Sequence, residues 1–377
     1  MKVLFWSEQY LPAIGGVEVW GAGLMRTLAS RGYSFAVVTC KPDRSLPDEE
    51  TIDGVEVYRF PFHPPIVERD LLGMRRLCAE ISALKKRLDP DVIHVNTTLP
   101  SIFYHVHTTR GDDRPTVVTM HSPPLFLDGT PQLFTQLVRA ATVVTAVSDA
   151  TRRQLIRAVP GIDDRTETVY NGLDAPDLQP ARLPFVPVHI VCAGRIVEDK
   201  GFDVALKAFR LFLEEHANAR MTIAGDGPKR PDLEILAADL GISDSVSFAG
   251  WVDRADIPAL MNTSTMVVVP SRWEEPFGLV ALQAAQVGRP VVATRVGGLP
   301  EVVVDAQTGM LVESEDPESM CSIMTDLVRN PQLAALLGAQ ARRRALTEFT
   351  MERCADRYDD AYRRAVATTP LFETSTP

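Results

Sequence analysis

Short runs of β-branched and apolar residues alternate with helical patterns along the chain, and this alternation is the strongest constraint on its fold. In the first half, such runs occur at residues 2–7, 35–40, 55–60, 91–96, 116–121 and 142–148, with helical patterns at residues 17–31, 71–88 and 131–140. Near-continuous apolar strands between helices are typical of a parallel sheet covered on both faces. We therefore predict a doubly wound α/β domain.

The pattern restarts after a proline-rich stretch at residues 175–187. Further strand patterns occur at residues 189–193, 221–224, 246–249, 266–269, 291–293 and 310–312, and the end of the chain is helical. A chain of 377 residues is long enough for two domains. We predict an α/β protein with Rossmann-like domains at residues 1–180 and 181–350 and a helical tail at residues 351–377. In such sheets, ligands bind beyond the carboxyl ends of the strands. We expect the two domains to face each other there and to form a cleft for the ligand.

Charge and cysteine content narrow the functional classes. The formal net charge of -10 disfavours a nucleic-acid partner, because phosphate backbones bind basic surfaces. The five cysteines are scattered and lack metal-ligand spacing, so we expect free thiols in a reducing compartment. No segment reaches the ~20 apolar residues that span a bilayer, and the first apolar run is broken by Glu8, unlike a signal peptide. The expected location is cytoplasmic.

One helical stretch, residues 69–87, has two possible roles. It combines Arg75 and Arg76 with apolar residues such as Leu71, and its last turn holds Lys85 and Lys86. Such a helix can lie on an anionic membrane as a peripheral contact. The alternative is a surface helix that packs its apolar stripe on the first sheet.

Two cations follow the first strand of the second domain. Gly194-Arg195 ends that strand, and Lys200-Gly201 opens the next helix. Helix N-termini prefer acidic residues, so cations there indicate an anionic ligand such as a pyrophosphate. Arginine would give fork-like contacts and lysine a point charge. The alternative is a structural ion pair with Glu198 or Asp199.

The segment 270–283 carries several polar groups at the end of a strand. Glu274 and Glu275 precede Pro-Phe-Gly, which leads into a helix whose first-turn amides can cradle phosphate or sugar oxygens. Side chains on a helix tilt toward its N-terminus, so Gln283 and Glu275 can face one ligand. The alternative is that a glutamate only caps the helix. The amides concerned belong to Gly278, Leu279 and Val280.

In the first domain, Gly15-Gly16 opens a helix and His121 ends a strand. Paired glycines let a ligand approach the backbone, although they also occur in plain turns. His121 can donate to a ligand hydroxyl or phosphate, or instead cap a loop carbonyl, whereas His94 lies inside a strand and should be a core residue. The second strand ends in Cys40-Lys41 rather than an acid, which disfavours nicotinamide or flavin binding. We predict no cofactor.

Together these features resemble the retaining nucleotide-sugar glycosyltransferases of family four, which have the GT-B fold. The resemblance covers nearly the whole chain. It rests on Gly15-Gly16, His121, Asn171-Gly172, the run from Gly194 to Gly201, the turn from Gly225 to Pro228, the segment from Glu275 to Gln283, and Val296-Gly297-Gly298-Leu299-Pro300-Glu301.

The resemblance implies roles for these residues. Arg195 and Lys200 would hold the pyrophosphate of a UDP- or GDP-sugar, and Glu275 would contact the sugar. The remaining donor and sugar contacts would come from the amides at Gly278, Leu279 and Val280, from Gly16 near the phosphate, from His121 at the sugar hydroxyls, and from the region of Trp251 and Val252 at the base. The acceptor, whether a sugar, a lipid-linked sugar or a small molecule, is not indicated. The tail would cross back to the first domain.

One residue departs from the family pattern. Gln283 stands where the family has a second glutamate that binds the ribose, and a neutral amide forgoes a charge-assisted bond worth ~1–2 kcal/mol. Arg195, Lys200 and the helix amides can meet the charge of the leaving group, so we expect hexosyl transfer that needs no metal, and the resemblance implies that it retains configuration. The alternatives are a nucleotide-sugar epimerase on the same scaffold and a two-lobed sugar-binding protein.

Overall fold

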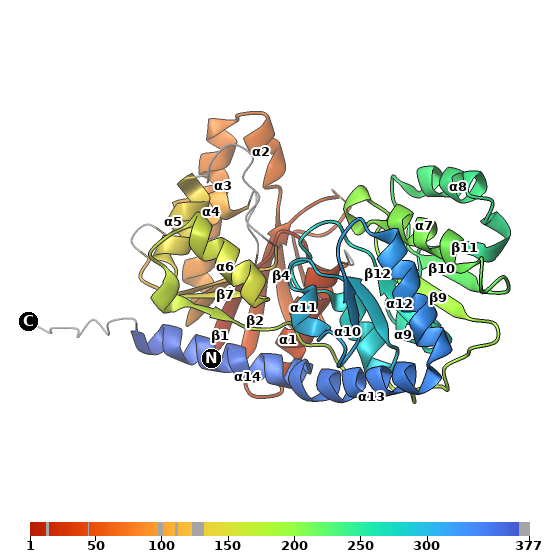
Figure 1. Ribbon diagram of the computed structural model, residues 1–377. Helices are drawn as coiled ribbons and strands as arrows, with labels where there is room; N and C mark the ends of the chain where they lie inside the picture. The colour runs from red at the N-terminus through yellow and green to blue at the C-terminus, as the bar shows by residue number, and fades with distance from the viewer. Residues whose placement is uncertain (13–14, 44, 97–100, 110–111, 123–131, 369–377) are drawn as a thin grey trace, which may run out of the picture. The chain divides into compact units, whose positions relative to one another are not determined.

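The computed structural model describes residues 1–12, 15–43, 45–96, 101–109, 112–122 and 132–368. The chain divides into two compact units (Figure 1). The first joins Met1–Gly172 to Met351–Pro377, and the second is Leu173–Thr350. Each is an α/β unit built on one sheet, which confirms the predicted fold class.

The sheet of the first unit has eight strands in the order β3-β4-β2-β1-β5-β6-β7-β8. Neighbouring strands are parallel except for β3 and β4. The strands are β1 (Lys2–Trp6), β2 (Ser34–Cys40), β3 (Glu49–Ile52), β4 (Val55–Phe60), β5 (Val92–Val95), β6 (Thr116–Met120), β7 (Val143–Ala146) and β8 (Thr166–Thr168). Strands β3 and β8 were not predicted, because both are short edge strands without the apolar run that marks the others.

Helices cover both faces of this sheet. Along β1, Val3 and Phe5 pack toward α1 and α14, whereas Leu4 and Trp6 pack toward α3, α4 and α5. This alternation follows from the two-residue period of a strand. The helices are α1 (Gly16–Ala29), α2 (His63–Val67), α3 (Leu71–Leu88), α4 (Ile102–His107), α5 (Gln132–Ala140), α6 (Asp149–Ala158) and α14 (Met351–Thr368).

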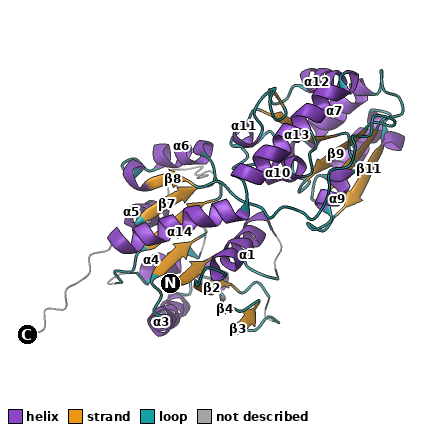
Figure 2. Cartoon of the chain, turned by 90° about the horizontal axis from the view of Figure 1, so that it is seen from below, coloured by secondary structure: helices purple, strands orange, loops and turns teal. Residues whose placement is uncertain are grey.

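The last helix, α14, lies beside α1 on the first unit, and both views show it there (Figures 1 and 2). Buried hydrogen bonds fix it to the sheet: His94 Nδ1 lies 2.7 Å from the Tyr362 hydroxyl, and His94 Nε2 lies 2.7 Å from Thr119 Oγ1. The Tyr358 hydroxyl lies 3.0 Å from the same Thr119 oxygen. His94 is therefore a hydrogen-bonded core residue, as predicted.

The sheet of the second unit has six parallel strands in the order β11-β10-β9-β12-β13-β14. Helix α10 packs on β12 and β13, and α13 packs on α10. The strands are β9 (His189–Ala193), β10 (Arg220–Ala224), β11 (Val246–Gly250), β12 (Met266–Val269), β13 (Val291–Thr294) and β14 (Met310–Val312). The helices are α7 (Phe202–Phe212), α8 (Arg230–Asp239), α9 (Ile257–Asn262), α10 (Leu279–Gln286), α11 (Leu299–Val302), α12 (Pro317–Arg329) and α13 (Pro331–Glu348).

The proline-rich segment belongs to the second unit. Asn262 binds both sides of it: its Oδ1 accepts from the Ala181 amide at 2.9 Å, and its Nδ2 donates to the Gln179 carbonyl at 2.9 Å. The buried Arg289 donates to the carbonyls of Ser264 and Ala181. These contacts place residues 175–187 within the second unit, and the chain divides at Gly172 rather than at residue 180.

Helix α3 packs its apolar stripe into the first unit. Leu77, Ile81 and Leu84 are buried in the core. Lys85 is buried as well, with its Nζ 3.4 Å from His105 Nδ1, so this lysine is not part of the basic surface predicted for the helix. None of the described helices is long and apolar enough to cross a membrane.

Candidate active site

The loop after β9 carries the two predicted cations of the second unit. It runs from Gly194 through a short 3-10 helix, Glu198–Lys200, to Gly201 at the start of α7. Gly201 has φ 64°, and a Cβ there would lie 2.1 Å from the Pro270 carbonyl oxygen. Only glycine allows the backbones after β9 and β12 to meet this closely. Lys200, the residue before Gly201, therefore stands next to the segment that contains Glu275.

Lys200 and Glu275, predicted as site residues, meet each other. Lys200 Nζ forms an ion pair with Glu275 Oε1, and the Ser271 hydroxyl donates to the same oxygen at 2.8 Å. The two side chains are 31% and 13% exposed, so the pair is half-buried. Within the described part of the chain, Lys200 forms no ion pair with the alternative partners Glu198 and Asp199. Ser271, which holds the carboxylate, was not predicted.

Arg195 differs from the other cations at this edge. In the second unit, all of whose residues are described, Arg195 is exposed and has neither an ion pair nor a side-chain hydrogen bond. Five other cations on these loops are paired: Lys200 with Glu275, Lys229 with Asp232, Arg230 with Glu234, Arg272 with Asp203 and Arg295 with Asp305. The guanidinium of Arg195 is thus available to an anion from solution.

Helix α10 presents its N-terminus beside Glu275. Gly278 caps it with φ 100°, and a Cβ there would lie 2.6 Å from Leu299 Cδ2. The amides of Leu279 and Val280 belong to the first turn, which has no acceptors within the helix. The Glu275 carbonyl accepts from the Gly298 amide at 2.7 Å, so the turn after β13 fixes this segment. Backbone donors, a carboxylate and a lysine converge here.

Gln283 occupies the second turn of α10. It is 9% exposed, and its amide has no hydrogen-bond partner among the described residues. Gln286, one turn later, donates to the carbonyl of Asp174 at 3.1 Å. The same helix therefore holds one amide that is bound to the protein and one that is not. Neither Gln283 Oε1 nor Gln283 Nε2 is among the fully buried atoms that lack a partner, so water or a ligand can reach this amide.

The loop after β11 adds a cation that the sequence did not indicate. Val252 is partly buried and Trp251 is 63% exposed. Two residues after Val252, Arg254 has a buried Nη2 without a partner, and burial lowers the pKa of its guanidinium. Its position shows no hydrophobic period or motif, so sequence reasoning had no signal for it. Arg254 and Arg195 are the two cations on the loops after β9 to β13 of the second unit that have no acidic partner.

In the first unit, His121 follows β6 and contacts Asn96, which follows the adjacent strand β5. His121 Nε2 lies 2.5 Å from Asn96 Oδ1, and the ring meets Trp20 edge-on with centroids 4.6 Å apart. Burial lowers the pKa of His121 to about 3, which keeps the imidazole neutral. Its partner is thus a side-chain amide rather than the loop carbonyl of the alternative interpretation.

Gly16 begins α1, with Gly15 as the N-cap. The Glu18 carboxylate folds back here, because a Cβ built on Gly15 would lie 2.2 Å from Glu18 Oε2. Gly16 itself is exposed. An anion at this helix N-terminus would have to displace a carboxylate that the protein supplies itself.

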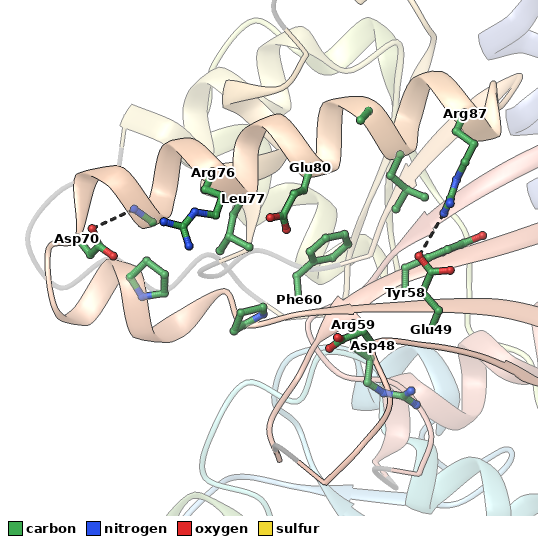
Figure 3. Close-up of a pocket in the computed structure, with 15 residues that line it drawn as sticks. Asp48, Glu49, Tyr58, Arg59, Phe60, Asp70, Arg76, Leu77, Glu80 and Arg87 are labelled. Atoms are coloured by element: carbon green, nitrogen blue, oxygen red, sulfur yellow. Dashed lines mark hydrogen bonds and ion pairs between the residues drawn. The ribbon is translucent and has the colours of Figure 1, made fainter.

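A cavity of about 700 Å³ lies elsewhere in the first unit, between β4 and α3 (Figure 3). Arg59 and Arg87 line it, but each already has an acidic partner, Glu50 and Glu49 respectively. Arg87 also stacks over the Tyr58 ring, 5.3 Å from its centroid. None of the predicted site residues lines this cavity, so its size alone does not make it the active site.

Known proteins similar to this chain settle its family. Residues 184–344 match the family described as glycosyl transferases group 1, and residues 14–176 match glycosyltransferase family 4. The D-inositol 3-phosphate glycosyltransferase of Acidothermus cellulolyticus is 32% identical over 402 residues, which cover 95% of this chain and 88% of that protein. The chain belongs to glycosyltransferase family 4. Another relative of this family 4 chain, glycogen synthase of Mycobacterium tuberculosis, is 27% identical and covers 94% of this chain and 92% of its own.

Solved structures agree on the fold. Sucrose-phosphate synthase of Thermosynechococcus elongatus has a TM-score of 0.83 at 23% identity and covers 97% of this chain and 99% of its own. Anabaena HepE in complex with UDP-glucose has a TM-score of 0.79 at 21% identity and covers 96% and 99%. The family 4 chain thus has the GT-B fold and is a retaining nucleotide-sugar glycosyltransferase. The predicted family, fold and reaction class are confirmed, and the roles of single residues stay predictions.

Proposed function

We propose that this enzyme transfers a hexose from a UDP-sugar to a hydroxyl acceptor without a divalent metal. The unpaired Arg195, at an edge where five other cations are ion-paired, carries the proposal. A diphosphate would supply the missing counter-charge through fork-like contacts. A GDP-sugar fits the same phosphate contacts, and the UDP-glucose complex of HepE favours uridine.

Donor binding would redistribute one ion pair. Lys200 now binds Glu275, and an arriving pyrophosphate offers it a stronger anionic partner. Lys200 and Arg195 would hold the phosphates, together with the amides of Leu279 and Val280. Glu275, released from Lys200 but still bound by Ser271, would accept from a sugar hydroxyl. The half-buried pair thereby holds both groups in place until the donor arrives.

The remaining donor contacts follow from burial and exposure. The Gln283 amide lacks a protein partner, so it can bind the ribose hydroxyls. The Gly278 amide would contribute to the donor contacts at the helix N-terminus, where Leu299 packs against the glycine. Val252 would contact the base from the loop after β11. Gln283 in place of a glutamate weakens this contact but keeps a donor and an acceptor for the two hydroxyls.

The reaction breaks the bond between the anomeric carbon and the phosphate oxygen. The acceptor hydroxyl attacks that carbon on the face from which the phosphate leaves, and its proton passes to the departing phosphate oxygen. Arg195 and Lys200 stabilise the negative charge that develops there. His121 stays neutral, so it would bind a sugar hydroxyl by hydrogen bonding rather than by charge. Gly16 would give a substrate phosphate access to the backbone of α1.

A screen of nucleotide sugars by thermal shift tests the proposal, followed by product analysis with the best donor. We expect a UDP-hexose to raise the melting temperature, free hexose to leave it unchanged, and the donor to be transferred or slowly hydrolysed. Isomerisation of the donor alone would indicate an epimerase, and stabilisation by free sugar would indicate a sugar-binding protein. Either result would overturn the proposal.

Peripheral membrane contact has a narrow structural basis. Val67, Leu71 and Leu72, at the end of α2 and the start of α3, are 78%, 69% and 72% exposed, and Arg75 and Arg76 are exposed next to them. We propose that this turn, rather than the whole of α3, touches an anionic bilayer. Sedimentation with anionic vesicles should fall for Leu71→Ser with Leu72→Ser and be unchanged for Leu336→Ser, an exposed leucine on α13.

A further inference from the structure

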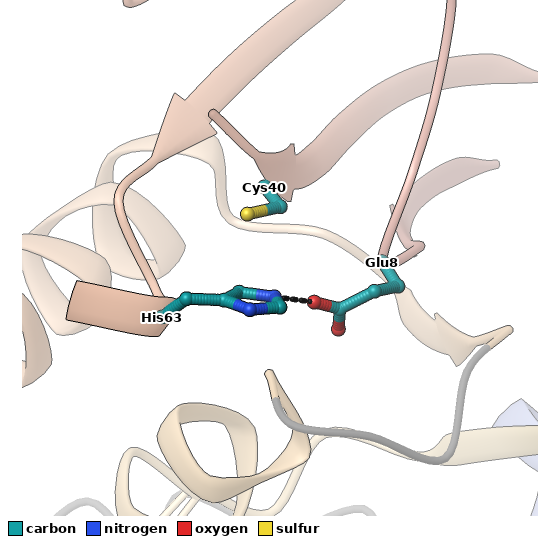
Figure 4. A group of neighbouring side chains, drawn as sticks. All are labelled: Glu8, Cys40 and His63. Atoms are coloured by element: carbon teal, nitrogen blue, oxygen red, sulfur yellow. Dashed lines mark hydrogen bonds and ion pairs between the residues drawn. The ribbon is translucent and has the colours of Figure 1, made fainter. Parts of the chain in front are cut away.

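Three side chains with metal-binding atoms converge at the carboxyl edge of the first sheet (Figure 4). Glu8 follows β1, Cys40 ends β2, and His63 begins α2 just after β4. These strands are adjacent and parallel, so their carboxyl ends lie side by side. One ligand atom from each residue lies within 4.8 Å of the others, and this is the one such cluster of three among the described residues.

We propose that Glu8, Cys40 and His63 bind a single zinc ion. Sulfur, imidazole nitrogen and carboxylate oxygen are the ligands of zinc, whereas magnesium and calcium prefer oxygen alone. A thiolate and a carboxylate together carry two negative charges, which match the charge of the ion. Three protein ligands leave a fourth position for water or a small molecule.

The surroundings already hold two of the ligands. The Ser101 amide donates to Glu8 Oε2 at 3.1 Å and leaves Oε1 facing His63. The amides of Lys41 and Phe62, next to Cys40 and His63, both donate to the Phe60 carbonyl, at 2.8 and 2.9 Å. The Cys40 amide donates to the Glu8 carbonyl at 3.1 Å, which ties two of the loops together. Hydrogen bonds to ligand atoms of this kind orient them and tune metal affinity.

Metal binding requires small, defined changes. Glu8 Oε1 and His63 Nε2 are now 2.6 Å apart in a hydrogen bond, and both must turn to the ion instead. The His63 side chain is 50% exposed, so packing does not hold it fully in place. Its proton moves from Nε2 to Nδ1, so that Nε2 offers its lone pair. The Cys40 thiol loses its proton to solvent and binds as the thiolate.

Cobalt(II) and zinc(II) alone are the probes, added to the full chain after chelator treatment and its removal. One equivalent of cobalt should give a thiolate-to-cobalt charge-transfer band with the visible bands of a tetrahedral site. Zinc should bleach both, and millimolar magnesium should not. Absence of stoichiometric binding, or bands without charge transfer, would overturn the proposal.

Variants assign the ligands. Cys40→Ser should abolish the charge-transfer band, and Cys40→Ser and His63→Gln should each weaken zinc at least about tenfold. The controls are Cys78→Ser, a partly buried thiol on α3, and His107→Gln, an exposed imidazole on α4, which should bind like the parent protein. Because His63 is a surface residue, its variant should fold even if Cys40→Ser does not.

Equal affinity of His63→Gln and His107→Gln for zinc would overturn the assignment. No arm measures turnover, so this result is independent of the proposed sugar transfer.

Discussion

The two sheets differ in whether the charged side chains at their carboxyl edges have a partner within the protein. In the first unit, Glu8 is hydrogen-bonded to His63 and the Asn96 oxygen to His121, although Asn96 Nδ2 is buried without a partner. In the second unit, Arg195 and Arg254 have no acidic partner, although other cations on the same loops do. Unsatisfied positive charge at a strand edge marks a place for an anionic ligand. This difference supports the proposal that the second unit binds the donor phosphates and the first unit binds hydroxyl groups.

Removal of the cations should have the largest effect. Arg195→Ala and Lys200→Ala should each lower kcat by about 10²–10³, the usual cost of losing one preorganised group that stabilises charge in the transition state. Arg195 is exposed and unpaired, so the melting temperature of its variant should not change.

Lys229→Ala is the matched control, because this exposed lysine lies on the loop after β10 and is already paired with Asp232. It should keep the kcat of the parent enzyme. Normal turnover in Arg195→Ala, or equal losses in Arg195→Ala and Lys229→Ala, would remove the distinction between paired and unpaired cations.

Glu275→Gln should lower kcat by about 10–10², since a hydrogen bond to a charged group contributes ~1.5–3 kcal/mol. The loss should appear in kcat more than in KM, because charge at the reacting carbon develops only in the transition state. Glu275 also binds Lys200, so a double-mutant cycle with Lys200→Ala should show strong coupling. Additive losses would mean that the pair does not act as one unit.

Gln283→Ala should raise the donor KM roughly tenfold, for one lost hydrogen bond of ~1.4 kcal/mol, and leave kcat nearly unchanged. Gln283→Glu should be tolerated and should tighten the donor. Gln286→Ala serves as a control on the same helix, because that amide binds the protein itself and should affect melting rather than KM. If Gln283→Ala lowered kcat alone, the ribose contact would be wrong.

The first unit should respond to acid through its neutral histidines. Burial lowers the pKa of His94 to about 3, whereas an unfolded chain protonates histidine near 6.5. Between these values only the unfolded chain gains the proton, so the free energy of unfolding should fall with decreasing pH, by at most ~1.4 kcal/mol per pH unit for this residue. Urea unfolding at pH 7 and pH 5 measures the slope. It should be smaller in His94→Gln, and an equal slope would contradict the neutral core imidazole.

Sequence patterns predicted more of the fold than of the site. Apolar runs such as residues 116–121 and 189–193 located the buried strands, because burial on both faces leaves a clear signal. The short edge strand β3 has polar residues facing solvent, and its pairing depends on β4 rather than on its own composition.

For the site, glycines and cations at strand ends were visible, but their partners were not. The Lys200–Glu275 pair joins loops far apart in the sequence, and only the sheet order brings them together. The missing partners of Arg195, Arg254 and Gln283 could not be predicted either, because the lack of a contact is a property of the folded chain. The same holds for Cys40, whose spacing from the other cysteines suggested no metal site.

Titration of UDP onto the full chain in excess chelator tests the central claim most directly. We expect metal-independent binding by the parent protein, binding weakened by about 10–10² in Arg195→Ala, and unchanged binding in Arg295→Ala, whose guanidinium is paired with Asp305. Binding that requires magnesium, or equal affinity in all three proteins, would contradict the assignment of the donor phosphates to the unpaired arginine of the second unit.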